Sequence, residues 1–187
     1  TVATRLGRTV GVQRVAGEGL DLYVRQNFLH THECAALIAM TETRRRPSTL
    51  LAVGKDDRAY RTSESGDLDR DDPLVAAIDA RIAGLLGLDI RHGETLQGQR
   101  YAVGQVFRAH QDWFVVGSHY WDAQRSGGET VFSRAGLIVT PHAAMLLAWD
   151  NMDATGEPNE QALHESVAVS AGVKTIVTKW FREGFWC

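Results

Sequence analysis

The first helical pattern in the chain covers residues 31–46. Apolar and small side chains recur there at the spacing of one face of an amphipathic helix. That face comprises Cys34, Leu37, Ile38 and Thr41. Thr31 is a suitable N-cap, and Pro47 follows the basic end of the segment, so we expect a helix between these two residues.

A second helix is predicted over residues 73–86. Asp72 can cap its first turn, Pro73 suits the first helical position, and Gly87 can end the last turn. The apolar stripe of this helix comprises Leu74, Ile78, Ile82, Leu85 and Leu86. Residues 54–72, before this helix, are polar and rich in turn formers. They form either a solvated loop or an ordered loop with a function.

The pattern changes to short strands from about residue 96 onward. Runs of aromatic and β-branched residues alternate with Gly, Ser and Pro at 96–107, 128–132, 136–140 and 143–149. Residues 164–181 have the pattern of a β-hairpin, with its turn near 170–172. Helices followed by many short strands predict an α+β fold, in which helices support a β-sandwich or jelly roll.

Composition and charge narrow the class of protein. The chain has 187 residues, 44% hydrophobic and 23% charged, which is typical of one soluble globular domain. A net charge of −3 gives no general attraction to nucleic acid or to an anionic membrane, and no apolar run is long enough to predict a membrane span. The two cysteines, Cys34 and Cys187, form no Cys-x-x-Cys site, so we expect a cytoplasmic location.

Two His-x-Asp/Glu motifs are candidates for chemistry, namely His110-Gln-Asp112 and His92-Gly-Glu94. Seven histidines and 23 acidic residues predict about one such motif by chance, so context has to decide between them. His92 lies in the connection after the second helix and is interpreted as part of a loop. His110 follows a strand, and side chains two residues apart in a strand share a face. Two histidines and one carboxylate are the ligand set of non-haem Fe(II) oxygenases.

The third ligand has to come from elsewhere, and His164 at the start of the predicted hairpin is the candidate. In that hairpin, Lys174 shares a face with His164 at an offset of roughly 13 Å, which a metal-bound dicarboxylate and a lysine stem can bridge. The alternative is that both residues are solvated positions at a strand edge. The other histidines, at 30, 32, 119 and 142, are interpreted as capping, surface, substrate-contact or turn residues.

Four stretches carry a resemblance to a known family. They are RTSESG (61–66), LQGQRYAVGQVFRAHQDWF (96–114), GGETVFSRAGLIVTP (127–141) and LLAWDNMDATGEPNEQALHESVAVSAGVKTIVTKWFRE (146–183). In this order they resemble the 2-oxoglutarate- and Fe(II)-dependent dioxygenases, specifically the prolyl 4-hydroxylase-like branch. The resemblance implies a distorted double-stranded β-helix, or jelly-roll, core within a single domain over residues 1–187. Helical support would occupy about 1–95 and the β core about 96–187.

The resemblance also implies roles for single residues. His110, Asp112 and His164 match the iron ligands of the family. Lys174 matches the lysine that binds the far carboxylate of 2-oxoglutarate, and Tyr101 matches a tyrosine that helps to hold the same cosubstrate. The expected substrate residues are Trp180, Arg61, Thr62 and Ser63, with a core aromatic as the alternative role for Trp180.

The implied function is hydroxylation of a prolyl residue or a related substrate, with release of succinate and CO2. The expected cofactors are Fe(II) and the cosubstrate 2-oxoglutarate, with L-ascorbate as an optional addition. The substrate class stays open between a peptide or protein and a small molecule, and the acidic balance argues against nucleic acid. Alternatives of another class are a jelly-roll binding module without iron and a zinc hydrolase.

One departure from the family pattern lies between Gln124 and Gly127. A core strand normally separates the His-x-Asp segment from the Gly-Gly-Glu-Thr stretch, whereas here the two are almost adjacent. Either the protein lacks this strand, or residues are omitted from the printed chain. We favour the second explanation, because loss of a central strand would expose sheet edges.

Overall fold

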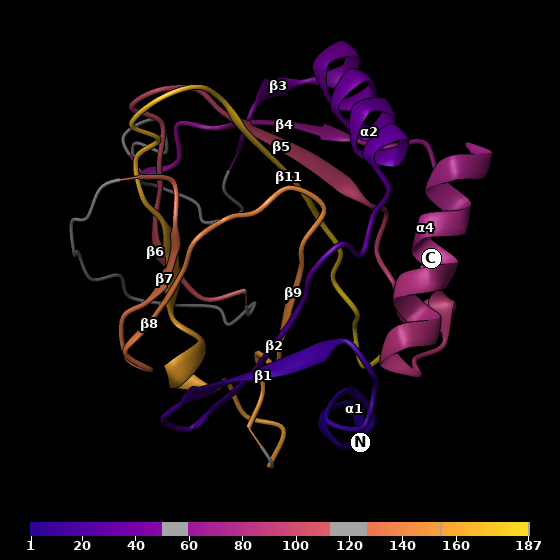
Figure 1. Cartoon of the computed structure of the whole chain (residues 1–187), viewed down its shortest axis with the longest axis vertical. Helices are drawn as coiled ribbons and strands as arrows, with labels where there is room; N and C mark the ends of the chain where they lie inside the picture. The colour runs from indigo at the N-terminus through magenta and orange to yellow at the C-terminus, as the bar shows by residue number, and fades with distance from the viewer. Residues whose placement is uncertain (50–59, 113–126, 154, 187) are drawn as a thin grey trace.

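The computed structural model describes residues 1–49, 60–112, 127–153 and 155–186 (Figure 1). The helices are α1 (Val2–Leu6), α2 (Thr31–Arg44), α4 (Pro73–Leu86) and the short 3-10 helices η1 (Ile90–His92) and η2 (Glu160–Ala162). The strands are β1 (Val12–Gly17), β2 (Leu20–Arg25), β3 (Arg46–Pro47), β4 (Glu64–Asp67), β5 (Gln97–Tyr101), β6 (Phe107–His110), β7 (Thr130–Phe132), β8 (Leu137–Val139), β9 (Leu146–Trp149), β10 (His164–Ser166) and β11 (Lys174–Thr178).

The strands form three antiparallel sheets, with strand orders β11-β5-β4-β3, β6-β10-β7-β8 and β1-β2-β9. Figure 1 shows β6, β7 and β8 on the left of the view, and α2 and α4 on the right, near β4 and β5. Helices combined with antiparallel sheets confirm the α+β class. The first 95 residues, expected to be helical support, contain strands β1 to β4 in addition to the helices.

Both predicted helices are present, and local signals explain their ends. The Asp72 carboxylate accepts hydrogen bonds from the first turn of α4, and Gly87 ends the helix with a left-handed φ of 72°. The N-cap of α2 is His30 rather than Thr31, because the Glu33 carboxylate accepts a 2.7 Å hydrogen bond from the His30 backbone N–H. On the predicted apolar face of α2, Leu37 and Thr41 are buried, whereas Ile38 is 44% exposed.

Helix α2 packs closely on the sheet that carries part of the candidate site. The close approach of α2 to β5 requires a glycine at position 98, because a Cβ there would lie 2.0 Å from the Thr41 hydroxyl oxygen. An apolar cluster then joins α2 and α4 to this sheet. It comprises Leu37, Leu68, Val75, Ile78 and Leu96.

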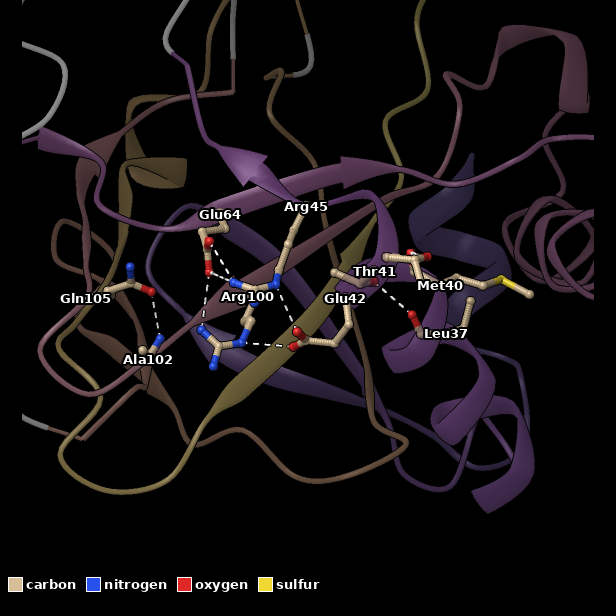
Figure 2. Close-up of polar contacts among 10 residues, drawn as sticks. Leu37, Met40, Thr41, Glu42, Arg45, Glu64, Arg100, Ala102 and Gln105 are labelled. Carbon is tan, nitrogen blue, oxygen red and sulfur yellow. Dashed lines mark hydrogen bonds and ion pairs between the residues drawn. The ribbon is translucent and has the colours of Figure 1, made fainter.

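Ion pairs at the end of α2 hold the same interface (Figure 2). Arg100 on β5 lies 2.9 Å from Glu42 and 3.2 Å from Glu64, and Arg45 lies 2.9 Å and 2.7 Å from the same two carboxylates. Residues alternate between the two faces of a strand, so Arg100 faces α2 while its neighbour Tyr101 faces the opposite side. The network therefore helps to set the position of Tyr101.

The predicted hairpin over residues 164–181 is wrong. Strand β10 pairs with β6 and β7, whereas β11 pairs with β5 in a different sheet. The connection therefore crosses from one sheet to the other instead of returning beside its own strand. Both segments have the side chains of buried strands, and long-range packing rather than the short turn selects their partners.

The loop predicted over residues 54–72 is also only partly correct. Residues 64–67 form β4, which pairs with β3 and β5, so this part is a strand inside a sheet. Its sequence, Glu-Ser-Gly-Asp, has low β-propensity, and the glycine is needed because Arg44 of α2 approaches it closely. Residues 54–59 lie outside the described residues.

Within the described part of the chain, β9 and β11 are the outermost strands of their sheets. Residues of both strands line one cavity of about 1250 Å³, which also includes Asp112 and Trp180. The departure expected between Gln124 and Gly127 falls within 113–126, outside the described residues, apart from Gly127 itself. No helix among the described residues is long and apolar enough to cross a membrane.

Candidate metal and cosubstrate site

Three side chains with metal-binding atoms converge at one end of the β6-β10 pair. His164, the first residue of β10, lies directly opposite His110, the last residue of β6. Asp112 follows His110 by two residues and lies just beyond the end of β6. Its carboxylate oxygens lie 3.6 Å from His110 Nε2 and 3.7 Å from His164 Nε2, and ligand atoms of all three residues lie within 4.8 Å of one another.

Backbone carbonyls determine which ring nitrogen faces the centre. His110 Nδ1 lies 2.8 Å from the Arg108 carbonyl oxygen, and His164 Nδ1 lies 2.9 Å from the Ala162 carbonyl oxygen. A carbonyl oxygen only accepts hydrogen bonds, so each Nδ1 carries the proton and each Nε2 keeps a free lone pair. Both imidazoles are therefore oriented as metal ligands.

The protonation states agree with metal binding. Burial and, next in size, the adjacent His164 lower the pKa of His110 to about 3, although Asp112 opposes the decrease. Burial alone raises the pKa of the Asp112 carboxyl, but the two histidines and the indole of Trp180 reverse this effect, leaving the pKa below its usual value. At neutral pH the group contains a neutral imidazole at His110 and a carboxylate at Asp112. Two imidazole nitrogens and one carboxylate suit Fe(II).

Aromatic rings surround the two imidazoles. The Phe107 ring stacks on His110 at a centroid distance of 3.5 Å, and Trp149 contacts His164 edge-on at 4.9 Å. The sequence analysis did not identify these aromatic neighbours, although Phe107 lies three residues before His110 in the same strand. Regular alternation along a strand would place residues 107 and 110 on opposite faces, so the contact with Phe107 reflects the irregular register of β6 against β10. The contact with Trp149 depends on tertiary packing.

Lys174 and Tyr101 enter the site from the opposite sheet. They are directly paired across β11 and β5, so their side chains share a face, and Lys174 Nζ lies 5.2 Å from the centre of the Tyr101 ring. Burial lowers the pKa of Lys174 to about 8, and the carboxylate of Glu129 limits that decrease. Lys174 lines the same cavity as Asp112. The cosubstrate roles of Lys174 and Tyr101 stay predictions, and the shared cavity supports the role of Lys174.

Arg61, Thr62 and Ser63 form part of the wall beside the metal ligands. The Arg61 guanidinium lies over the Phe107 ring at 4.4 Å and donates a 3.2 Å hydrogen bond to the Ser63 hydroxyl. The Thr62 hydroxyl accepts a 2.8 Å hydrogen bond from the Val106 backbone N–H. Because Ser63 is only 2% exposed, its hydroxyl is available to neighbouring side chains more than to solvent.

Trp180 lies just beyond β11, and its indole interacts with the Asp112 carboxylate and helps to lower the pKa of that group. The preceding residue, Lys179, forms a buried ion pair of 2.5 Å with Asp79 of α4, which fixes this segment against the helix. Trp180 lines the cavity together with Asp112 and Lys174. A contact with a proposed metal ligand was not among the roles expected for this residue.

The remaining described histidines lie outside this group. His30 and His32 stack on each other at the start of α2, His142 lies in the connection before β9, and His119 is outside the described residues. His92 lies in η1, as expected for a connection, and its Nδ1 is 3.0 Å from the Arg182 carbonyl oxygen. The segment His92-Gly-Glu94 lies in the connection after α4, as predicted, but His92 ends a 3-10 helix and Gly93 forms an isolated β-bridge with Phe181.

Comparison with known proteins places this chain in a family. No protein-family model matches the chain. A probable prolyl 4-hydroxylase of Arabidopsis thaliana, number 10, is 32% identical to it, and the match covers 85% of this chain and 68% of the relative. The chain spans about a quarter of the length of the animal prolyl 4-hydroxylase α subunits that it also matches.

Solved structures show the same fold. The viral collagen prolyl hydroxylase of Paramecium bursaria Chlorella virus-1, in complex with 2-oxoglutarate, has a TM-score of 0.65 at 21% identity, covering 85% of this chain and 94% of the viral one. A Trichoplax adhaerens prolyl hydroxylase, in complex with a hypoxia-inducible factor peptide, has a TM-score of 0.61 at 14% identity, covering 96% and 86%. These likenesses confirm the jelly-roll core, and together with the Arabidopsis relative they show that the chain belongs to the prolyl 4-hydroxylase family.

Proposed function

We propose that this protein is an Fe(II)- and 2-oxoglutarate-dependent dioxygenase that hydroxylates a prolyl residue of a peptide or protein. The observation that carries the proposal is the shared cavity, which holds Asp112 of the His110–Asp112–His164 group and, from another sheet, the ammonium of Lys174. A metal chelated by a 2-oxo acid needs free ligand positions on one side and a cation at the far end of the acid. The described residues provide both.

His110, Asp112 and His164 would hold Fe(II), and Lys174 would bind the far carboxylate of 2-oxoglutarate. Together the metal and the cosubstrate would supply the oxidising chemistry, in which O2 and 2-oxoglutarate yield succinate, CO2 and one hydroxyl group on the substrate. The 2-oxoglutarate complex of the viral structure supports this choice of cosubstrate. L-Ascorbate stays a prediction.

The protein side chains contribute orientation and shielding rather than the oxidation itself. The Arg108 and Ala162 carbonyls hold both imidazoles with Nε2 directed inward, and the Trp180 indole orients the Asp112 carboxylate. Phe107, which stacks on His110, limits the access of water to that ligand. Such fixed surroundings hold the ligands in position before substrate binds.

A peptide substrate is supported by the names of the relatives and by the peptide in the Trichoplax complex. Arg61, Ser63 and Trp180 are the proposed substrate-side residues. Arg61 and Ser63 lie in the wall beside Phe107, and Trp180 lines the cavity. Trp180 has a second proposed role, because its indole interacts with the Asp112 carboxylate. A cytoplasmic location stays a prediction as well.

The first test combines anaerobic binding with turnover. Anaerobic protein is mixed with Fe(II) and 2-oxoglutarate, and the weak visible absorption band of the 2-oxo acid chelate is recorded. O2 is then admitted in the presence of proline-containing peptides, and succinate and hydroxyproline are quantified. The band, followed by equal amounts of both products, is the expected result. Folded protein that gives neither the band nor succinate would contradict the proposal and favour a binding module.

A further inference from the structure

The ammonium of Lys174 has few protein partners for a buried cation. Among the described residues, its recorded hydrogen-bond acceptor is the Ser166 hydroxyl oxygen at 2.8 Å, and no carboxylate lies within ion-pair distance. Glu129 acts on it only at longer range. An ammonium has three N–H donors, so two remain for a ligand once Ser166 is bound. Ser166 therefore determines where the remaining donors point.

Ser166 lies on the strand that also carries a proposed metal ligand. It follows His164 by two residues in β10 and is only 7% exposed, so both side chains enter the interior from the same face. Two residues along a strand correspond to roughly 6.5 Å, which is comparable to the length of a five-carbon dicarboxylate. One strand thus carries both a proposed metal ligand and the hydroxyl that binds the Lys174 ammonium.

The hydroxyl proton of Tyr101 is directed away from this point. Tyr101 donates a 3.0 Å hydrogen bond to the Gln99 side-chain oxygen, and the Gln99 amide donates in turn to the Thr178 hydroxyl at 3.2 Å. Thr178 completes the series by donating to the backbone carbonyl of Gln97 at 3.3 Å. The oxygen of Tyr101 is left as an acceptor. Burial raises the pKa of this phenol, and the nearby Arg61, Ser63 and Ser166 oppose that increase. Ser166 therefore lies close to both Lys174 and an anchored phenol.

We propose that Ser166 is a positioning residue for the far carboxylate of 2-oxoglutarate. Its hydroxyl holds the Lys174 ammonium in place, and this contact makes the site prefer a dicarboxylic 2-oxo acid over a monocarboxylic one. The inference rests on the proposed function, since it assigns a role within the same cosubstrate site. Ser166 was not among the residues that the sequence suggested.

The test compares the binding of 2-oxoglutarate with that of 2-oxovalerate. 2-Oxovalerate has the carbon chain of 2-oxoglutarate and the same chelating end, but it lacks the far carboxylate. Both acids are titrated into anaerobic Fe(II)-loaded protein, and dissociation constants are measured from the visible band and by calorimetry. Ser166→Ala is expected to weaken 2-oxoglutarate binding about tenfold, the usual effect of losing a hydrogen bond to a charged group, and to leave 2-oxovalerate binding unchanged.

Three further variants separate positioning from general damage. Ser166→Thr keeps the hydroxyl and should restore most of the affinity. Thr43→Val removes an α2 hydroxyl that donates to the Met40 backbone carbonyl at 2.9 Å, away from the β5 contact, and it should bind both acids as the unmodified protein does. In a Lys174→Ala background, adding Ser166→Ala should cause no further loss, because the proposed effect acts through the lysine.

The outcomes separate the two proposals. Equal weakening of both acids by Ser166→Ala, or no weakening of either, would overturn the role of Ser166 while leaving the proposed function in place. Binding of neither acid by the unmodified, folded protein would instead overturn the proposed function, and the role of Ser166 with it.

Discussion

At the scale of single residues, the proposed metal centre depends on where each imidazole directs its free nitrogen. Two backbone carbonyls bind Nδ1 of His110 and His164, and this alone turns both Nε2 atoms toward Asp112. The same two hydrogen bonds fix the tautomer in which each Nε2 can serve as a ligand atom. Lys174 is likewise placed by direct pairing with Tyr101.

Replacement of a proposed metal ligand should remove metal binding. We expect His164→Ala to lower Fe(II) affinity by more than about 100-fold, because even loss of an outer-shell partner costs 10 to 100-fold, and to abolish coupled turnover. Equilibrium binding of Fe(II) under anaerobic conditions measures the first effect, and succinate release the second. His92→Ala, in the other His-x-Glu motif, is the matched control and should bind Fe(II) normally. Full activity in His164→Ala would remove this histidine from the ligand set.

Binding of 2-oxoglutarate should depend on pH through Lys174. Its pKa is lowered by burial to about 8, so the ammonium that attracts the carboxylate is present below that pH and lost above it. The affinity of the metal-loaded protein should therefore fall as pH rises above about 8, by up to about tenfold per pH unit. Anaerobic titrations between pH 7 and roughly 9.5 measure this.

Lys174→Arg provides the control for this pH dependence. A guanidinium stays protonated throughout the range, so the decrease above pH 8 should disappear even if the absolute affinity changes. An unchanged pH dependence in this variant would show that another group is responsible.

At the scale of elements, α2 determines how β5 lies and therefore where Tyr101 points. The helix approaches so closely that Gly98 has no room for a side chain, and the Glu42, Arg45, Glu64 and Arg100 network fixes the other end of the contact (Figure 2). Pairs of this kind at a partly exposed surface each contribute little on their own. The steric fit at Gly98 should matter more.

Gly98→Ala should destabilise the fold by about 1–3 kcal/mol, since the added methyl group would meet the Thr41 hydroxyl at 2.0 Å and force α2 away from β5. Chemical denaturation with a common m-value measures the change. Gly84→Ala is the matched control within α4, where an added Cβ meets nothing within 4 Å, and it should stabilise the protein by about 0.5–1 kcal/mol. Equal effects of the two substitutions would contradict a close α2–β5 contact.

At the scale of the whole molecule, the sheets that contain β9 and β11 end at strands that the described residues leave unpaired on their outer side. Both strands line the cavity of about 1250 Å³, and all of their residues are only half-buried. Open edges and a cavity of this size are unusual in a packed core. The shortened stretch before Gly127 falls within residues 113–126, outside the described residues, and the missing strand stays a prediction.

A strand supplied at this point should stabilise the molecule. We expect that inserting an alternating apolar and polar segment of about ten residues between Gln124 and Arg125 will raise the unfolding midpoint, because a strand can pair with open edges and fill the cavity. Denaturant unfolding measures the change. A Gly/Ser segment of the same length is the control and should lower the midpoint or leave it unchanged. A similar rise with both segments would rule out strand pairing as the cause.

The sequence by itself determined the features that depend on local chemistry. Helix α4 was predicted because Asp72, Pro73 and Gly87 each act within one turn of the helix end. The His110-Gln-Asp112 spacing and the ordered family motifs identified the proposed ligands and Lys174, since such spacings are read directly along the chain. The place of His92 in the connection after α4 was predicted for the same reason.

Tertiary structure alone decided which strands pair and which side chains meet. The segments around His164 and Lys174 have the composition of hairpin strands, yet β10 and β11 join different sheets because their buried faces pack against β6 and β5. The contact between Ser166 and Lys174 follows from that arrangement, as does the contact between Trp180 and Asp112. Strand partners depend on contacts far apart in sequence, and no local pattern specifies them.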